Sequence, residues 1–317
     1  MPRNPAITRR GALRAAAAVA VAAGAGGALA GTASGAAPAA APSPDPRMSQ
    51  WYVKNEHVWD NEDYSEELQG ITAGTEYWYI ANNSDDSGEG IWRVTHDFAQ
   101  RTLMIKNPAR DHHLGDIGFD FARNRIYAAL EPAKVWEIAV DGAQGATVRI
   151  VPLGGNGPRP QGDSMPWCAV NPRDGLLYSS AFGDSGQSIP QVTQVHAYDP
   201  ADGFRLVRTI ALPHAIRRVQ GGAFSPLGRL YVSSDATKDV RGYALPGAGG
   251  GPAAYLGSCA LNAPDLEVEG LVVGYPKNHA TQAGGHMWVH AVCLDNDWPS
   301  GDDAYVKHVS VPDAMTV

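Results

Sequence analysis

The sequence predicts an all-β protein built from one repeated unit, and two observations support that prediction. Short runs rich in Val, Ile, Tyr and Trp recur along the 317 residues, and turn signals such as Asp141-Gly142 and Asp174-Gly175 separate them. The 36 Gly and 23 Pro residues favour many turns over long helices, and helical periodicity is hard to find.

The unit repeats five times, at intervals of about 50 residues. Each copy begins with a short strand of small and apolar residues, continues with an aromatic strand such as 229–232, and ends with further strands. Four strands per repeat is the pattern of a propeller blade, which buries its faces by stacking on its neighbours around a ring. We therefore predict a single β-propeller of about five four-stranded blades. The five first strands align without gaps at residues 69–72, 115–118, 167–170, 221–224 and 269–272.

The N-terminal part of the mature chain offers a way to close the ring. A sixth blade would need about 45 further residues before Glu67, more than the mature chain provides there. Residues 50–53 (QWYV) instead have the character of a strand. Paired with the last blade, this strand leaves the ring without a free sheet edge.

Two strings in the fourth repeat, residues 219–226 (VQGGAFSP) and 228–235 (GRLYVSSD), resemble the exported bacterial YVTN and SMP-30-like β-propeller superfamily. The resemblance covers roughly the whole mature chain and is specific for the blade. It implies membership of a group that mixes lactonases, esterase-like hydrolases and non-enzymatic binders. In its metal-dependent members a divalent cation sits in the central tunnel, held by acidic and amide side chains of the innermost strands.

The N-terminus predicts export. Arg9 and Arg10 precede an uncharged run of Ala, Val and Gly over residues 15–30, which is too short and too weakly hydrophobic to span a membrane. Residues 8–14 (TRRGALR) look like a twin-arginine signal, and an ordinary secretory signal is the alternative. We expect a signal peptide over residues 1–30, an Ala/Pro-rich linker over 31–47, the propeller over 48–317, and a secreted, extracellular protein.

The net charge of the chain disfavours some classes of binding partner. The full chain has a formal net charge of −8, and loss of the signal removes four arginines and no acidic residue, so the mature protein is more acidic still. An acidic surface disfavours nucleic acid and anionic membranes, and no other apolar stretch approaches membrane length. We expect a monomer without a membrane span that binds a small molecule or a saccharide.

The repeat alignment predicts which side chains gather near the axis of the ring, because equivalent positions of the innermost strands are related by rotation. The first column of the alignment reads Glu67, His113, Met165, Val219 and Glu267. The column two residues later reads Gln69, Gly115, Trp167, Gly221 and Glu269. Asp116 and Gln220 occupy adjacent positions.

These side chains permit two kinds of chemistry. Several carboxylates and amides suit Ca²⁺, with Glu67, Asp116 and Glu269 as ligands. Alternatively, Asp116 and Glu269 act as an acid and base pair in a hydrolase or lyase, with His113 as a further catalytic candidate. Two alternatives remain open, a tunnel whose polar lining has no catalytic role and a propeller that binds a glycan, peptide or protein. The expected ligand-binding residues are Glu67, Gln69, Trp167 and Gln220.

Three cysteines in an exported protein allow one disulfide. Cys259 and Cys293 are the expected pair, although the first falls on an outer strand and the second on an inner strand of the next blade. Cys168 falls on the third innermost strand, where we expect it to be buried.

Overall fold

The computed structural model describes residues 52–59, 64–84, 88–109, 112–141, 144–274, 287–295 and 303–311. The predicted signal peptide and linker lie outside these residues. Within them, the only helix is a 3-10 turn, η2 (Pro200–Asp202), and no helix is long and apolar enough to cross a membrane.

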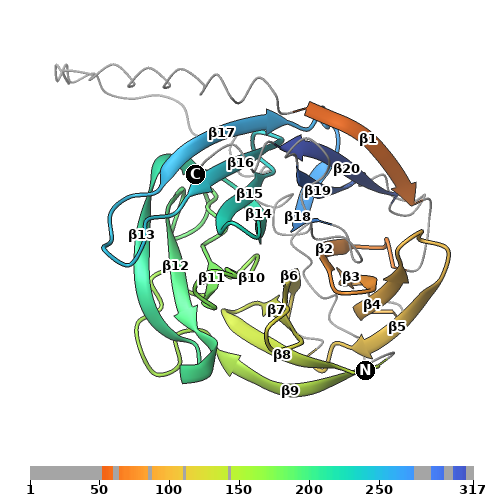
Figure 1. Ribbon diagram of the computed structural model, residues 1–317, viewed down its shortest axis with the longest axis horizontal. Coiled ribbons are helices and arrows are strands. Elements are labelled where there is room, and N and C mark those ends of the chain that lie inside the picture. Colours follow the sequence, from red (N-terminus) through yellow and green to blue (C-terminus); the bar gives the residue numbers. More distant parts are fainter. Residues whose placement is uncertain are drawn as a thin grey trace, which may run out of the picture. The chain divides into compact units, whose positions relative to one another are not determined.

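The described residues form five four-stranded antiparallel sheets around a common axis, which confirms the predicted propeller (Figure 1). Blade 1 contains β2 (Leu68–Ala73), β3 (Tyr77–Asn82), β4 (Gly90–Thr95) and β5 (Arg101–Lys106). Blade 2 contains β6 (Leu114–Asp120), β7 (Arg125–Leu130), β8 (Lys134–Asp141) and β9 (Gln144–Pro152).

The next two blades repeat the same order from the axis outward. Blade 3 contains β10 (Ala169–Val170), β11 (Leu177–Ser179), β12 (Val192–Asp199) and β13 (Arg205–Ile216). Blade 4 contains β14 (Val219–Phe224), β15 (Arg229–Ser234), β16 (Asp239–Ala244) and β17 (Ala254–Ala260).

Blade 5 joins the two ends of the propeller. It contains β18 (Glu267–Val273), β19 (Met287–Leu294), β20 (Ala304–Val311) and, as its outermost strand, β1 (Tyr52–Trp59). β1 runs antiparallel to β20, from Tyr52 opposite Ser310 to Trp59 opposite Ala304. The predicted closure of the ring by an N-terminal strand is confirmed, because β1 supplies the fourth strand of the last blade.

Burial follows the radius of the ring. The innermost strands β2 and β6 are buried at every residue, whereas β13, an outermost strand, alternates between exposed and covered residues. Five clusters of buried apolar side chains fill the spaces between the blades, and each draws its residues from two neighbouring blades. The core is therefore divided into five wedges, and the innermost strands are held at the axis by packing on both faces.

The expected disulfide does not form, since all three cysteines are free. Cys259 lies on β17, the outermost strand of blade 4, and Cys293 lies on β19, the second strand of blade 5. Both are buried in the apolar cluster between these two blades, and burial raises the pKa of the Cys259 thiol to about 11. Cys168 is fully buried, as expected.

Candidate functional site

The carboxylate of Asp116 lies at the axis and connects four blades. Its Oδ1 accepts hydrogen bonds from the backbone N–H groups of Ile71 (3.1 Å) in blade 1 and Ile117 (2.9 Å) in its own blade. Its Oδ2 accepts from Gly222 in blade 4 and Leu271 in blade 5, both at 3.1 Å.

The main chain of Asp116 reaches the remaining blade. Its backbone N–H donates to the carbonyl oxygen of Pro166 at 2.8 Å, just before β10 of blade 3. Asp116 therefore contacts all five blades.

Glycines make room for this one side chain. A Cβ added to Gly70 would lie 2.6 Å from the Cα of Asp116, and a Cβ added to Gly270 would lie 2.5 Å from its Oδ1. A Cβ on Gly221 would lie 2.7 Å from the Cα of Gly270. The innermost strands of blades 1, 2, 4 and 5 thus approach one another too closely for a second side chain at this level of the axis.

β-bulges in the innermost strands correct the gapless alignment. The pairing with the second strand shifts between Leu114 and Ile117 in β6 and between Val268 and Leu271 in β18. In β14 it shifts between Val219 and Gly222. When the bulges are superposed, Gly222 lies level with Ile117 and Leu271. The sequence alignment had placed it one residue earlier, level with Asp116 and Gly270.

This corrected register places Arg218 in the column of Glu67, His113 and Glu267, in the position that the sequence alignment gave to Val219. Glu67 and Arg218 share a left-handed backbone, with φ of 49° and 50°. The same hydrogen bond recurs at three of these positions, because the carbonyl oxygens of Glu67, His113 and Arg218 each accept from the first residue after the second strand, namely Asn83, Glu131 and Asp235.

The corrected columns define a group of polar side chains, called the polar cup, at the end where the innermost strands begin. Its outer ring is Glu67, His113, Arg218 and Glu267, and its inner ring is Gln69, Gln220 and Glu269. The inner ring is buried, with exposed fractions of 6% for Gln69, 3% for Gln220 and 2% for Glu269, whereas the outer ring is partly exposed. Below both rings lies the carboxylate of Asp116.

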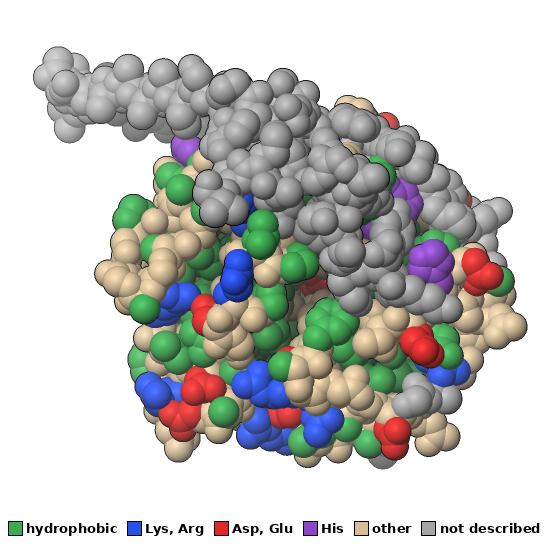
Figure 2. Space-filling model, in the orientation of Figure 1, with side chains coloured by type: hydrophobic (Ala, Val, Ile, Leu, Met, Phe, Trp, Pro, Cys, Tyr) green, Lys and Arg blue, Asp and Glu red, His purple; other side chains and the backbone are tan. Residues whose placement is uncertain are grey.

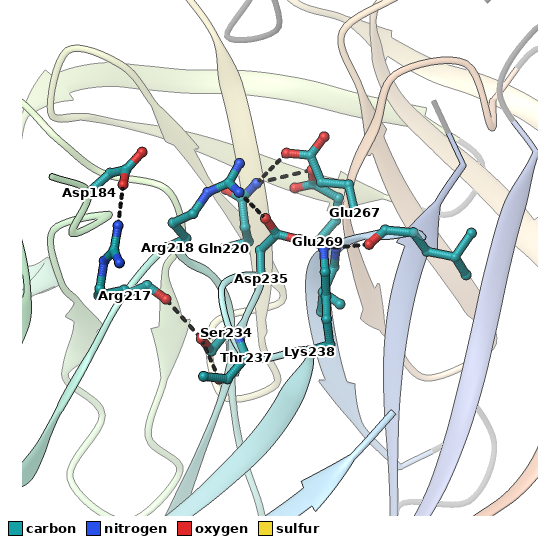
Figure 3. A network of polar contacts seen from close by, with 12 residues as sticks. Asp184, Arg217, Arg218, Gln220, Ser234, Asp235, Thr237, Lys238, Glu267 and Glu269 are labelled. Carbon is teal, nitrogen blue, oxygen red and sulfur yellow. Dashed lines mark hydrogen bonds and ion pairs between the residues drawn. The ribbon is translucent and has the colours of Figure 1, made fainter. Parts of the chain in front are cut away.

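Two carboxylates converge on one amide in this cup. The Nε2 of Gln220 donates to Oε1 of Glu267 and to Oε1 of Glu269, both at 3.1 Å (Figure 3). A single nitrogen that serves two carboxylates places them side by side. Glu267 was present in the sequence alignment but was not among the predicted catalytic residues.

An ion cluster around the buried carboxylate of Asp235 holds the strand segment that carries this pair of carboxylates. Asp235, at 1% side-chain exposure, pairs with Arg218 at 2.9 Å and also with Lys238. Its Oδ1 accepts from the backbone N–H of Val268 at 2.9 Å, the residue between Glu267 and Glu269. Asp235 and Arg218 were missed by the sequence analysis, because the one-residue shift at the bulge hid the position of Arg218.

His113 has a defined tautomer. Asn83 is oriented by Leu114, whose N–H donates to Asn83 Oδ1 at 2.8 Å and whose carbonyl oxygen accepts from Nδ2 at 2.8 Å. Nδ2 is therefore the donor in its 3.0 Å contact with His113 Nδ1. The imidazole accepts at Nδ1 and, when neutral, carries its proton on Nε2, which makes it a hydrogen-bond donor rather than a base at that nitrogen.

Two predicted roles do not fit this geometry. Trp167 was expected to bind a ligand, yet it is fully buried, its indole N–H donates to Ser180 Oγ at 2.9 Å, and its ring fills the space beside Gly222. Asp116 was expected to act as a catalyst and metal ligand, yet four backbone donors occupy the acceptor sites of its two oxygens.

The described residues do not form the expected Ca²⁺ site. Within the described ranges, no three His, Cys, Asp or Glu side chains form a group that fits a metal ion, and this includes Glu67, Asp116 and Glu269. Burial raises the pKa of Asp116 to about 8, although its four N–H donors act in the opposite direction. A carboxyl whose acceptor sites are filled by four backbone donors is a poor ligand for a hard cation.

Comparison with known proteins identifies no family for the chain. No family model matches the chain, and no curated protein matches it.

Three solved structures show a distant similarity to the chain. A protein proposed to be a gluconolactonase is 15% identical, with 84% of this chain and 97% of that chain covered and a TM-score of 0.48. A streptogramin B lyase is 10% identical, with 84% and 76% covered and a TM-score of 0.43. The PQQ-bound aldose sugar dehydrogenase of Streptomyces coelicolor is 16% identical, with 78% and 83% covered and a TM-score of 0.40.

Proposed function

We propose that the polar cup is the active site of a hydrolase or lyase that acts on a small molecule or a saccharide. The observation that carries this proposal is the convergence of Glu267 and Glu269 on the amide of Gln220. Paired carboxylates with different exposure to solvent are the usual equipment for general acid and base catalysis.

In a hydrolytic step, one carboxylate accepts a proton from water, the resulting hydroxide attacks the scissile centre, and a carboxylic acid returns a proton to the leaving oxygen. Glu267, which is half-buried, is the member of the pair that a bound substrate touches first. Glu269 lies behind it, within reach of the same amide. The Nε2 atom of His113 is buried, so this imidazole has a positioning role, through its contact with Asn83 at Nδ1.

Asp116 has a positioning role in this proposal. Its bond to Leu271 fixes β18 two residues after Glu269, and its bond to Gly222 fixes β14 two residues after Gln220. Glu67 and Gln69 supply further polar contacts on the blade 1 side of the cup. We derive no step through a metal ion, since the described residues do not form the expected Ca²⁺ site.

The test is an activity screen of the mature protein on lactones, esters and polysaccharides. We expect Glu269→Gln and Glu267→Gln each to lower the rate on the best substrate at least about a hundredfold, as for loss of a general acid or base. Glu76→Gln is the matched control, because Glu76 is exposed in the turn between β2 and β3 at the far end of blade 1. Activity that survives in both cup variants contradicts the assignment, and no activity on any class favours the non-catalytic binding propeller.

We also propose that the protein is exported by the twin-arginine route. The support is the sequence of residues 8–14, with its paired arginines ahead of a weakly hydrophobic run. Replacement of Arg9 and Arg10 by lysine retains the charge, so an ordinary secretory signal would still work. We expect the double variant to remain in the cytoplasm, and secretion at the parental level would contradict the twin-arginine assignment.

A further inference from the structure

A concave site lies at the end of the axis opposite the polar cup, where the innermost strands finish. It is a pocket of about 440 Å³, within the range of sites that hold small molecules. Its floor includes Ile117, Gly118 and Gly222, directly beyond the level of the Asp116 carboxylate. This pocket therefore shares the axis with the polar cup but faces the other way.

Aromatic rings form much of the pocket wall. Phe119 and Phe121 lie with their centroids 4.7 Å apart and their planes tilted by 57°, and Phe224 packs against Tyr178 on the other side. Phe121 is 48% exposed, the most exposed of the large hydrophobic side chains among the described residues. Rings held in place by their neighbours, with one ring open to solvent, offer a preformed surface for stacking.

The lining carries no free charge. Among the described residues that line the pocket, Asp120 is the only ionisable one. Its Oδ2 pairs with the Arg123 guanidinium at 2.6 Å, and its Oδ1 accepts from the backbone N–H groups of Ala122 (3.0 Å) and Arg123 (3.2 Å). A charged ligand would lose its hydration here without gaining a partner, so the lining selects against ions.

Around this axis the surface is mixed in sign. Figure 2 shows acidic and basic side chains interspersed over the coloured part of the face that it displays. An uncharged lining within such a surface is a local feature of the pocket rather than a property of the whole molecule.

We propose that this pocket binds an uncharged small molecule that carries an aromatic ring. The ring stacks between Phe121 and Phe224, and its edge rests on the backbone of Gly118 and Gly222 at the floor. The site is separate from the polar cup and does not depend on the function proposed there.

The probe for this site is N-phenyl-1-naphthylamine, an uncharged aromatic compound whose fluorescence rises in apolar surroundings. We expect saturable binding of one molecule per chain. Val273→Glu adds a carboxylate to the pocket lining, and we expect it to raise the Kd at least tenfold. Val207→Glu is the matched control, because Val207 is 45% exposed on β13, away from the pocket, and its Kd should equal that of the parent.

Phe121→Ala is a second variant that tests the site without disturbing the fold, because loss of this exposed ring leaves no cavity in the core. We expect it to weaken binding while the melting temperature stays within a few degrees of the parental value. Naphthalene should compete with the probe and 1-naphthoate should not.

Three results would overturn the proposal. The first is binding that is non-saturable or equal in Val273→Glu and Val207→Glu, and the second is equal competition by naphthoate. The third is a dimer that Val273→Glu dissociates in sedimentation experiments while the parent protein fails to bind the probe, which would make the pocket an interface between two copies of the chain.

Discussion

The two ends of the propeller axis differ in chemistry although blades 1, 2, 4 and 5 supply residues to both. Where the strands begin, their side chains are carboxylates, amides, an imidazole and a guanidinium, tied to one another by hydrogen bonds and ion pairs. Where they finish, the side chains are mainly Phe, Val, Ala and Pro. Asp116 and its glycine neighbours lie between the two ends and block side chains from the axis. Because the blades meet at this level, each end can be altered without the other.

The largest effect on stability is expected from a change of Asp116, at the level where the blades meet. Asp116→Ala leaves four buried backbone N–H groups without their acceptor, each worth about 1–3 kcal/mol when unsatisfied. We expect a loss of about 4 kcal/mol or more in the free energy of unfolding, measured by urea denaturation. Asp163→Ala is the control, because Asp163 has 77% side-chain exposure and makes a single surface ion pair. Equal stability of the two variants would show that the carboxylate does not hold the blades together.

A smaller loss of stability is expected when a second side chain is placed at the level of Asp116 on the axis. In Gly270→Ala the new methyl group meets Asp116 Oδ1 at 2.5 Å and Gly70 Cα at 2.6 Å. Overpacking of this kind costs about 1–3 kcal/mol. Gly249→Ala provides the comparison, since nothing lies within 4 Å of its Cβ. If thermal unfolding shows Gly270→Ala to be as stable as Gly249→Ala, the axis is more open than described.

The pH dependence of stability tests the effect of burial on the carboxyl group of Asp116. Burial raises the pKa of Asp116 from 3.8 to about 8 in the folded protein. The folded state therefore holds this proton while the unfolded chain loses it, so the contribution of Asp116 to stability is complete below about pH 4 and is lost as the pH rises to about 8. Urea denaturation between pH 4 and pH 9 should show this decline in the parent relative to Asp116→Asn. A difference between the two proteins that is flat or grows with pH would contradict the raised pKa.

The smallest change in stability is expected in the cup. Gln220→Ala removes the bridge between Glu267 and Glu269, but Glu267 is partly open to water, which can replace the lost donor. We expect about 1 kcal/mol of destabilisation together with a clear loss of activity. Gln187→Ala, at an exposed position in the loop between β11 and β12, should change neither. A loss of stability as large as that of Asp116→Ala would mean that the cup is part of the structural centre.

The fold was predictable because the length of the repeat, the number of strands per blade and the closure of the ring all follow from local sequence patterns. The aromatic second strands and their turns fixed the phase of every blade, and the strand before Glu67 had an evident partner in the last blade. The register within β14 was not predictable, since the two residues Gly221 and Gly222 give no sign of which one lies level with Asp116. A one-residue shift at a bulge then exchanged Arg218 for Val219 in the outer ring.

The individual roles were less predictable for a different reason. Asp116 carries a carboxylate, which is a side chain that commonly serves as a catalyst or a metal ligand. That it binds backbone N–H groups instead follows only from the close approach of glycines in three other blades. Trp167 likewise looks like a ligand platform until Gly222 is seen to leave space for its ring. Side-chain chemistry was visible in the sequence, but the distance between blades at the axis was not.

The central claim is that Glu267 and Glu269 carry the chemistry of the polar cup. The most direct test is kcat/KM for the parent and for Glu267→Gln, Glu269→Gln and Glu76→Gln, measured side by side on the best substrate of the screen. The account predicts a loss of about a hundredfold or more in each of the first two variants and none in the third. Parental kcat/KM in both cup variants would contradict it.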